Sequence, residues 1–150
     1  MKQRILIVED EVALRLAIRW QLKSLEKTLG VEIDPIESRS PSKAFDVLEQ
    51  GEPLQAAIID LRLVSSQGVD HDAGFAVIER LAEQTPPVPV VVLSARNDFE
   101  ALAATKKSTN VRFYITKPWN SKDLQRAVSD CLSGQAKGLI KIGDFEGEHS

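Results

Sequence analysis

Five side chains suited to phosphoryl chemistry each follow a short apolar run that is typical of a β-strand. They are Glu9, Asp10, Asp60, Ser94 and Lys117. In a parallel sheet with helices on both faces, functional groups gather at the carboxyl ends of the strands. We therefore expect these side chains, although distant in sequence, to converge on one small pocket.

Each residue type has a separate role in such a pocket. The carboxylates of Glu9, Asp10 and Asp60 are the oxygen ligands that Mg²⁺ or Mn²⁺ prefers. Asp60 follows a buried type of strand and is the candidate nucleophile, because aspartyl phosphate is a known covalent intermediate. Lys117 can neutralise a phosphate oxygen and Ser94 can donate a hydrogen bond to another. Singly, each residue also fits a structural role, but their occurrence after successive strands favours the functional one.

Apolar runs and helical patterns alternate five times along the chain, which predicts an α/β fold with a doubly wound, five-stranded parallel sheet and five helices. The strands are expected near 3–8, 31–37, 55–60, 88–93 and 111–115. The helices are expected near 11–29, 41–50, 74–84, 97–108 and 120–133. Pro35 places the second strand at an edge of the sheet.

The composition is ordinary for a globular protein, with 43% hydrophobic residues in 150. A net charge of −3 favours no nucleic-acid partner, and no apolar run approaches the length of a membrane span. A single cysteine, Cys131, is consistent with the cytoplasm. We expect one domain over 1–133 and a short extension over 134–150, without an output domain.

Four segments resemble the receiver domain of response regulators from two-component systems. They are ILIVEDE (5–11), AAIIDLRL (56–63), VVVLSAR (90–96) and FYITKPW (113–119). The resemblance implies a flavodoxin-like fold and a Mg²⁺-dependent signalling protein that takes a phosphoryl group from a histidine kinase or phosphotransfer protein. Such a protein switches a partner-binding surface or relays the phosphate. It catalyses its own phosphorylation and dephosphorylation and is not a dedicated enzyme.

The resemblance also implies a role for each site residue. Glu9 and Asp10 correspond to the acidic metal pair, Asp60 to the phospho-acceptor, and Lys117 to the phosphate-binding lysine. Ser94 corresponds to the switch hydroxyl and Tyr114 to the switch aromatic residue. The backbone carbonyl of Arg62 would complete the metal ligands, and Arg62 and Arg96 occupy positions that influence the lifetime of the phosphate.

Three surface residues are candidates for partner contacts. Leu16 and Trp20 share an outward face of the first helix, and Trp119 follows Lys117 near the edge where the family docks its kinases. The alternative for Leu16 and Trp20 is that the apolar residues 139–142 of the tail cover them. For Trp119 the alternative is partial burial.

Other functions stay open to different degrees. The stretch from Leu61 to Ala73 is longer than in most family members, so a phosphorylation-independent interaction scaffold is an alternative. A haloacid-dehalogenase-type phosphatase needs a second acid two residues after the nucleophile, and Arg62 stands there. A phosphorylation-dependent homodimer is also left open.

Overall fold

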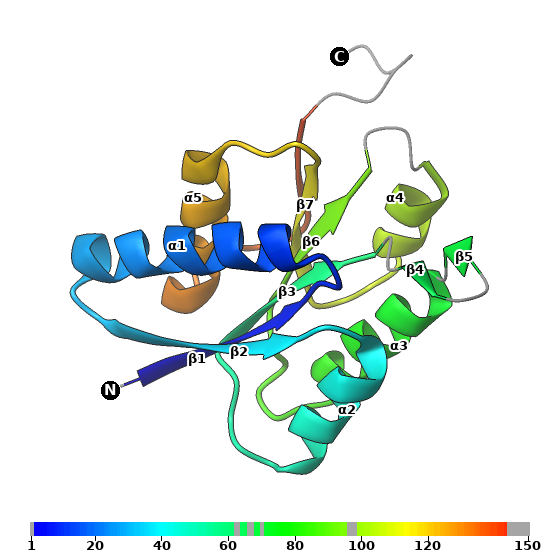
Figure 1. Ribbon diagram of the computed structural model, residues 1–150, viewed down its shortest axis with the longest axis horizontal. Coiled ribbons are helices and arrows are strands. Elements are labelled where there is room, and N and C mark those ends of the chain that lie inside the picture. The colour runs from blue at the N-terminus through cyan, green and yellow to red at the C-terminus, as the bar shows by residue number, and fades with distance from the viewer. Residues whose placement is uncertain (1, 62–63, 66–67, 70, 96–98, 144–150) are drawn as a thin grey trace.

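Alternating strands and helices form a parallel sheet that is covered by helices on both faces (Figure 1). The structure, a computed structural model, describes residues 2–61, 64–65, 68–69, 71–95 and 99–143. Its strands are β1 (Lys2–Val8), β2 (Glu32–Ser38), β3 (Ala56–Asp60), β4 (Val64–Ser65), β5 (Gly68–Val69), β6 (Val90–Ser94), β7 (Val111–Thr116) and β8 (Ile140–Ile142). Its helices are α1 (Val12–Leu29), α2 (Pro41–Glu49), α3 (His71–Ala82), α4 (Phe99–Thr105) and α5 (Ser121–Ser133).

The main sheet has the order β2-β1-β3-β6-β7-β8, and all its pairings are parallel. Every residue of β3 and β6 is buried, as their almost purely aliphatic sequences predict for strands covered on both faces. β2, which contains Pro35, lies at one edge as predicted. The flavodoxin-like α/β fold is therefore confirmed.

The helices divide between the two faces of the sheet. Figure 1 shows α1 and α5 on one face and α2, α3 and α4 on the other. On α1, Ile18, Leu22 and Leu25 form the buried stripe that its helical periodicity predicts. In the part of the chain that the structure describes, no helix combines the length and apolar character needed to cross a bilayer.

The main sheet has six strands where five were predicted, because the short apolar run after α5 adds β8 to it. Successive side chains of an extended segment point to opposite faces of a sheet. Leu139 accordingly packs against the core that α2, α3 and α4 cover, and Ile142 against the core under α1 and α5. A three-residue strand is too short to show this alternation clearly in sequence.

The long connection after β3 contains more regular structure than we expected. Two of its short segments, β4 and β5, pair as antiparallel strands. Helix α3 begins at His71, three residues before the expected start, and α4 ends at Thr105, three residues before the expected end. Ends of helices are the least certain part of a prediction from sequence.

We predict that Ile59→Ala lowers the free energy of unfolding by about 2–4 kcal/mol, because Ile59 is fully buried and its truncation leaves a cavity. Leu16→Ala is the control, since Leu16 is exposed and should cost at most about 0.5 kcal/mol. Urea unfolding measures both variants. Equal losses would contradict the assignment of β3 to the centre of the sheet.

Candidate phosphoryl-transfer site

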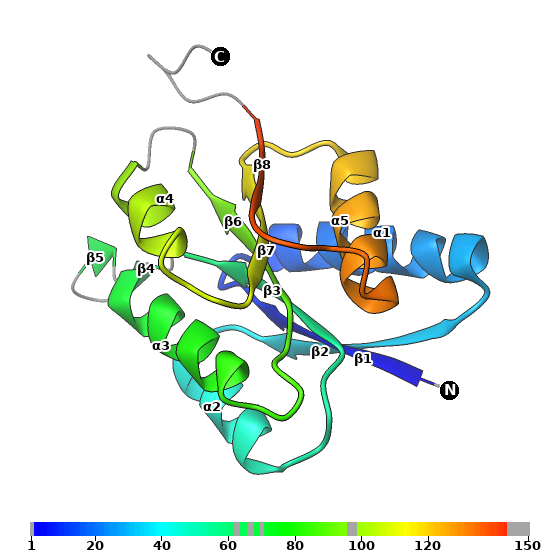
Figure 2. The same cartoon turned by 180° about the vertical axis from the view of Figure 1, so that it is seen from behind.

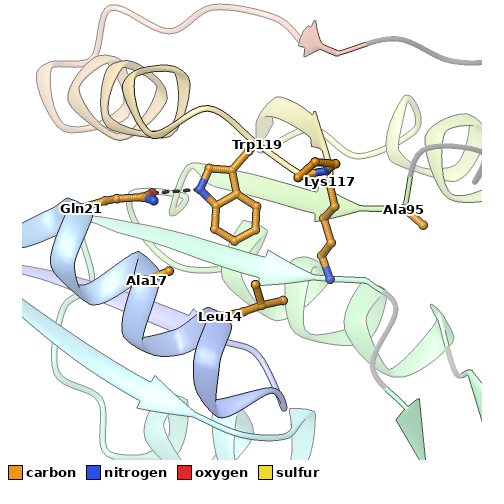
Figure 3. A pocket seen from close by; sticks show the side chains of 7 residues that line it. Leu14, Ala17, Gln21, Ala95, Lys117 and Trp119 are labelled. Atoms are coloured by element: carbon orange, nitrogen blue, oxygen red, sulfur yellow. Dashed lines mark hydrogen bonds between the residues drawn. The ribbon is translucent and has the colours of Figure 1, made fainter.

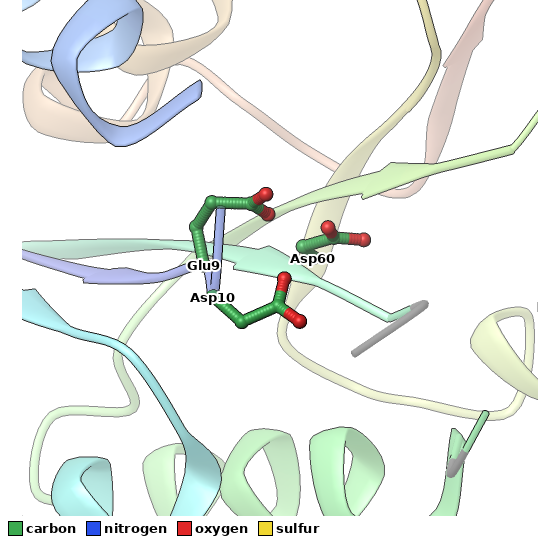
Figure 4. Close-up of side chains that lie close together, drawn as sticks. All are labelled: Glu9, Asp10 and Asp60. Atoms are coloured by element: carbon green, nitrogen blue, oxygen red, sulfur yellow. The ribbon is translucent and has the colours of Figure 1, made fainter. Parts of the chain in front are cut away.

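The carboxyl ends of neighbouring strands bring three carboxylates together. Glu9 and Asp10 follow β1, and Asp60 is the last residue of β3, which pairs with β1. Figure 4 shows the three side chains converging, and one carboxylate oxygen of each lies within 4.8 Å of the others. The structure thus brings together the acids that the sequence indicated.

Lys117, the first residue after β7, adds a cation to this group. The Nζ of Lys117 donates a hydrogen bond to Asp60 Oδ2 at 2.5 Å. The backbone of Lys117 is anchored to the next strand, because its N–H donates to the carbonyl oxygen of Ser94 at 2.8 Å. The Lys117–Pro118 peptide bond is cis. The Lys117 ammonium therefore bonds directly to one of the three acids that converge here.

Glu9 carries the main electrostatic cost of the site. Its side chain is 1% exposed, and neither carboxylate oxygen accepts a hydrogen bond from a described residue. Burial raises the pKa of Glu9 to about 9, and a hydrogen bond with Asp60 and the negative charges of Asp60 and Asp10 add to the rise. Lys117 opposes it. Two carboxyl groups can share a hydrogen bond only while one is protonated, so Glu9 holds a proton near neutral pH.

These acids fit a divalent cation. Buried carboxylate oxygens without donors are costly unless a charge or a proton compensates them. A cation among Glu9, Asp10 and Asp60 would supply that charge, and all three offer the hard oxygen ligands of Mg²⁺. The observation that supports this fit is that both carboxylate oxygens of Glu9 are buried and accept no hydrogen bond from a described residue.

Ser94 and Tyr114 are both buried in the interior. Ser94 is fully buried at the end of β6, and its hydroxyl has no hydrogen-bond partner among the described residues. Tyr114 is fully buried on β7 in the core under α2, α3 and α4. A buried hydroxyl without a partner at the end of the strand beside Asp60 is available to a new acceptor there.

Arg15 is a positioning residue that the sequence did not indicate. Its Nη1 donates to the carbonyl oxygens of Glu9 at 2.8 Å and of Asp10 at 3.3 Å, and its Nε lies 3.7 Å from Glu37. A basic side chain in the first turn of α1 is unfavourable to the helix dipole. That mismatch was the available signal that Arg15 holds the acidic turn in place.

An apolar pocket of about 440 Å³ opens beside Lys117, between α1 and the loop after β7 (Figure 3). Trp119 lines it, is half-buried, and donates through its indole N–H to Gln21 Oε1 at 2.9 Å. Partial burial is thus correct for Trp119, although it also faces the pocket.

Leu16 and Trp20 are 49% and 74% exposed, and β8 pairs with β7. The interpretation that residues 139–142 cover the pair is therefore wrong. The predictions for Arg62 and Arg96 concern residues outside those the structure describes.

The chain belongs to the response regulator receiver domain family, whose model matches residues 5–129. A crystal structure of a response regulator receiver protein from Sinorhizobium medicae aligns with a TM-score of 0.68 at 24% identity, covering 89% of this chain and 97% of that one. A receiver protein from Burkholderia phymatum aligns at 0.64 and 26% identity, covering 87% and 95%.

Two curated relatives are longer regulators. The chain is 27% identical over 146 residues to the virulence transcriptional regulatory protein PhoP of Salmonella typhi. This alignment covers 95% of this chain and 59% of that protein. It is 27% identical over 128 residues to the hydrogenase transcriptional regulatory protein HoxA of Bradyrhizobium diazoefficiens, covering 85% and 24%. The chain therefore spans between a quarter and three fifths of these relatives.

We predict that metal-free protein loses stability as the pH rises from 6 to 8, and that Glu9→Gln removes about 1–2 kcal/mol of that loss. The folded state keeps a proton on Glu9 up to about pH 9, whereas the unfolded chain releases it near its ordinary value of 4.5. The folded state therefore binds more protons in this window, and stability falls with pH.

Urea unfolding with a chelator present measures this difference, and Glu11→Gln, an exposed neighbour, serves as the control. Added Mg²⁺ should stabilise the wild type at pH 8 more than it stabilises Glu9→Gln. Parallel pH profiles for the wild type and Glu9→Gln would contradict the electrostatic description of the site.

Proposed function

We propose that this chain is a phospho-acceptor that takes a phosphoryl group onto Asp60 from a phosphohistidine of a histidine kinase or phosphotransfer protein. The observation that carries the proposal is the close group of three carboxylates with Lys117 bonded to Asp60. Phosphoryl transfer needs positioning and charge neutralisation more than covalent chemistry, and this group supplies both.

The transfer requires few groups of the protein. One carboxylate oxygen of Asp60 attacks phosphorus, a P–O bond forms, and the P–N bond to the donor imidazole breaks. The imidazole keeps the electron pair of that bond. The ammonium of Lys117, already at 2.5 Å from Asp60, neutralises charge on the phosphoryl oxygens as they arrive.

Glu9, Asp10 and Asp60 would hold Mg²⁺, with the backbone carbonyl of Arg62 as the further ligand expected from the family. When bound, the ion would offset the negative charge that the acids and the phosphoryl group bring together. Arg15 keeps Glu9 and Asp10 in place through their carbonyl oxygens. The site would act on the protein's own phosphorylation and its loss, and not on a free substrate.

The switch would use the buried hydroxyl of Ser94, which has no partner among the described residues and could donate to a phosphoryl oxygen on Asp60. Tyr114, already inside, would be held there by the same movement. Two states that differ by a few kcal/mol suffice for such a switch. Arg62 and Arg96 would influence how long the phosphate lasts.

The phosphodonor would dock on the outward face of α1. Val12, Leu16 and Trp20 recur there at every fourth residue and are 60%, 49% and 74% exposed. This apolar stripe lies on the helix that also lines the pocket beside Lys117. An amphipathic helix that carries the phosphohistidine could cover the stripe while its imidazole reaches the site.

Incubation with acetyl phosphate and Mg²⁺ should phosphorylate the wild type, as seen on a phosphate-affinity gel. Asp60→Asn should give no product, and Lys117→Ala should reduce the rate about 100-fold or more, because a preorganised charge is lost. Asn120→Ala, an exposed helix cap, is the control. Equal phosphorylation of wild type and Asp60→Asn would contradict the assignment of the acceptor.

Trp20→Ala should slow phosphoryl uptake from a phosphohistidine-bearing phosphotransfer domain about 10-fold or more, because tryptophan often dominates the binding energy of an interface. Uptake from acetyl phosphate should be unchanged, and Lys27→Ala, exposed on the same helix, should change neither. Loss with both donors would argue for a structural role of Trp20.

The scaffold alternative is favoured by the exposed stripe alone. Under it, a partner would bind Asp60→Asn as tightly as the phosphorylated wild type.

A further inference from the structure

Strand β8 forms the edge of the sheet next to β7, the strand that directly precedes Lys117. Figure 2 shows it running alongside β7 after the chain has crossed from the end of α5. Its residues pair in parallel with β7, with Ile140 beside Phe113 and Ile142 beside Ile115. An edge strand presents unpaired backbone groups to other strands, and here the chain's own segment covers them.

At the carboxyl end of β8 the chain passes close to Thr116. Thr116 is 6% exposed, and its Oγ1 donates a long hydrogen bond of 3.5 Å to the carbonyl oxygen of Ile142. Gly143 follows with φ of 110°, and a Cβ at that position would overlap Thr116 Oγ1. Only glycine therefore lets the chain pass Thr116 at this distance.

The carboxyl end of β7 is linked to Asp60 through Lys117. Thr116 immediately precedes Lys117, whose ammonium binds Asp60 and whose N–H binds the carbonyl oxygen of Ser94. A phosphoryl group on Asp60 would give Lys117 a new partner beyond its present one. Thr116 bonds to the carbonyl oxygen of Ile142 and leaves no room for a side chain at Gly143, so a shift of Lys117 that moves Thr116 would disturb both of these contacts.

We propose that residues 139–143 are an intramolecular ligand of the β7 edge, and that phosphorylation of Asp60 loosens them. The proposal rests on the proposed function, since it takes Asp60 as the acceptor. Release would uncover the backbone groups of β7 for an extended segment of a partner. Coupling between two sites is reciprocal, so loosening this segment must favour the phosphorylated state by the same factor.

Hydrogen exchange by mass spectrometry on the full chain tests the coupling, with beryllofluoride and Mg²⁺ as the phosphoryl mimic. We expect exchange over 139–143 to rise about fivefold or more in the wild type and to stay unchanged in Asp60→Asn. Unchanged or slower exchange over 139–143, with protection around Asp60 and Ser94, would overturn the inference alone. Absence of protection around Asp60 would count against the proposed function itself.

Two glycine variants test the reciprocal effect. Gly143→Ala should raise exchange over 139–143 and tighten beryllofluoride binding about fivefold. Gly138→Ala is the matched control, because Gly138 also has a positive φ of 71° but nothing lies within 4 Å of an added Cβ. Equal effects of both variants would overturn the role of the Thr116 contact. Protection that rises with protein concentration would place the strand on a second copy and overturn the intramolecular assignment.

Discussion

The packing of three carboxylates beside the Lys117 ammonium is the constraint on which the site depends. Glu9 is buried, its oxygens accept no hydrogen bond from a described residue, and Lys117 bonds to Asp60. Such an arrangement is unfavourable in isolation, because like charges in a poorly solvated site repel. It becomes favourable when protons or a divalent cation bind. In the function proposed above, the electrostatic cost of folding this site would also favour the binding of a cation and of the incoming phosphoryl group.

The rest of the fold keeps this arrangement in place. β1, β3, β6 and β7 are consecutive neighbours, so their carboxyl ends place acids, hydroxyl and lysine along one edge. Arg15 binds the acidic turn, and β8 pairs with β7, the strand that immediately precedes Lys117. Glu9 and Asp10 lie just before α1, whose outward face is exposed. On the other side of the site, Lys117 follows β7, which pairs with β8. A change of charge at Asp60 has a physical route to both surfaces.

Sequence patterns predicted the buried strands, which depend on apolar periodicity, and the site residues that follow directly after those strands. Fully aliphatic runs such as Val90–Leu93 indicated buried strands, and their order located Glu9, Asp10, Asp60 and Lys117 at one edge. They did not predict β8, because a strand of three residues is too short to show the alternation of a strand in sequence. The role of Arg15 was also missed, because it acts on backbone carbonyl groups and its one sequence signal is a basic residue in the first turn of a helix.

The central claim is that Asp60 becomes the covalent acceptor within this acidic group. The most direct measurement is reduction of the phosphorylated protein with borohydride, which converts an aspartyl phosphate to homoserine, followed by peptide mass spectrometry. Our account predicts homoserine at position 60 alone, formed only when Mg²⁺ was present during phosphorylation. Homoserine at another acidic position, or none after proven phosphoryl uptake, would contradict it.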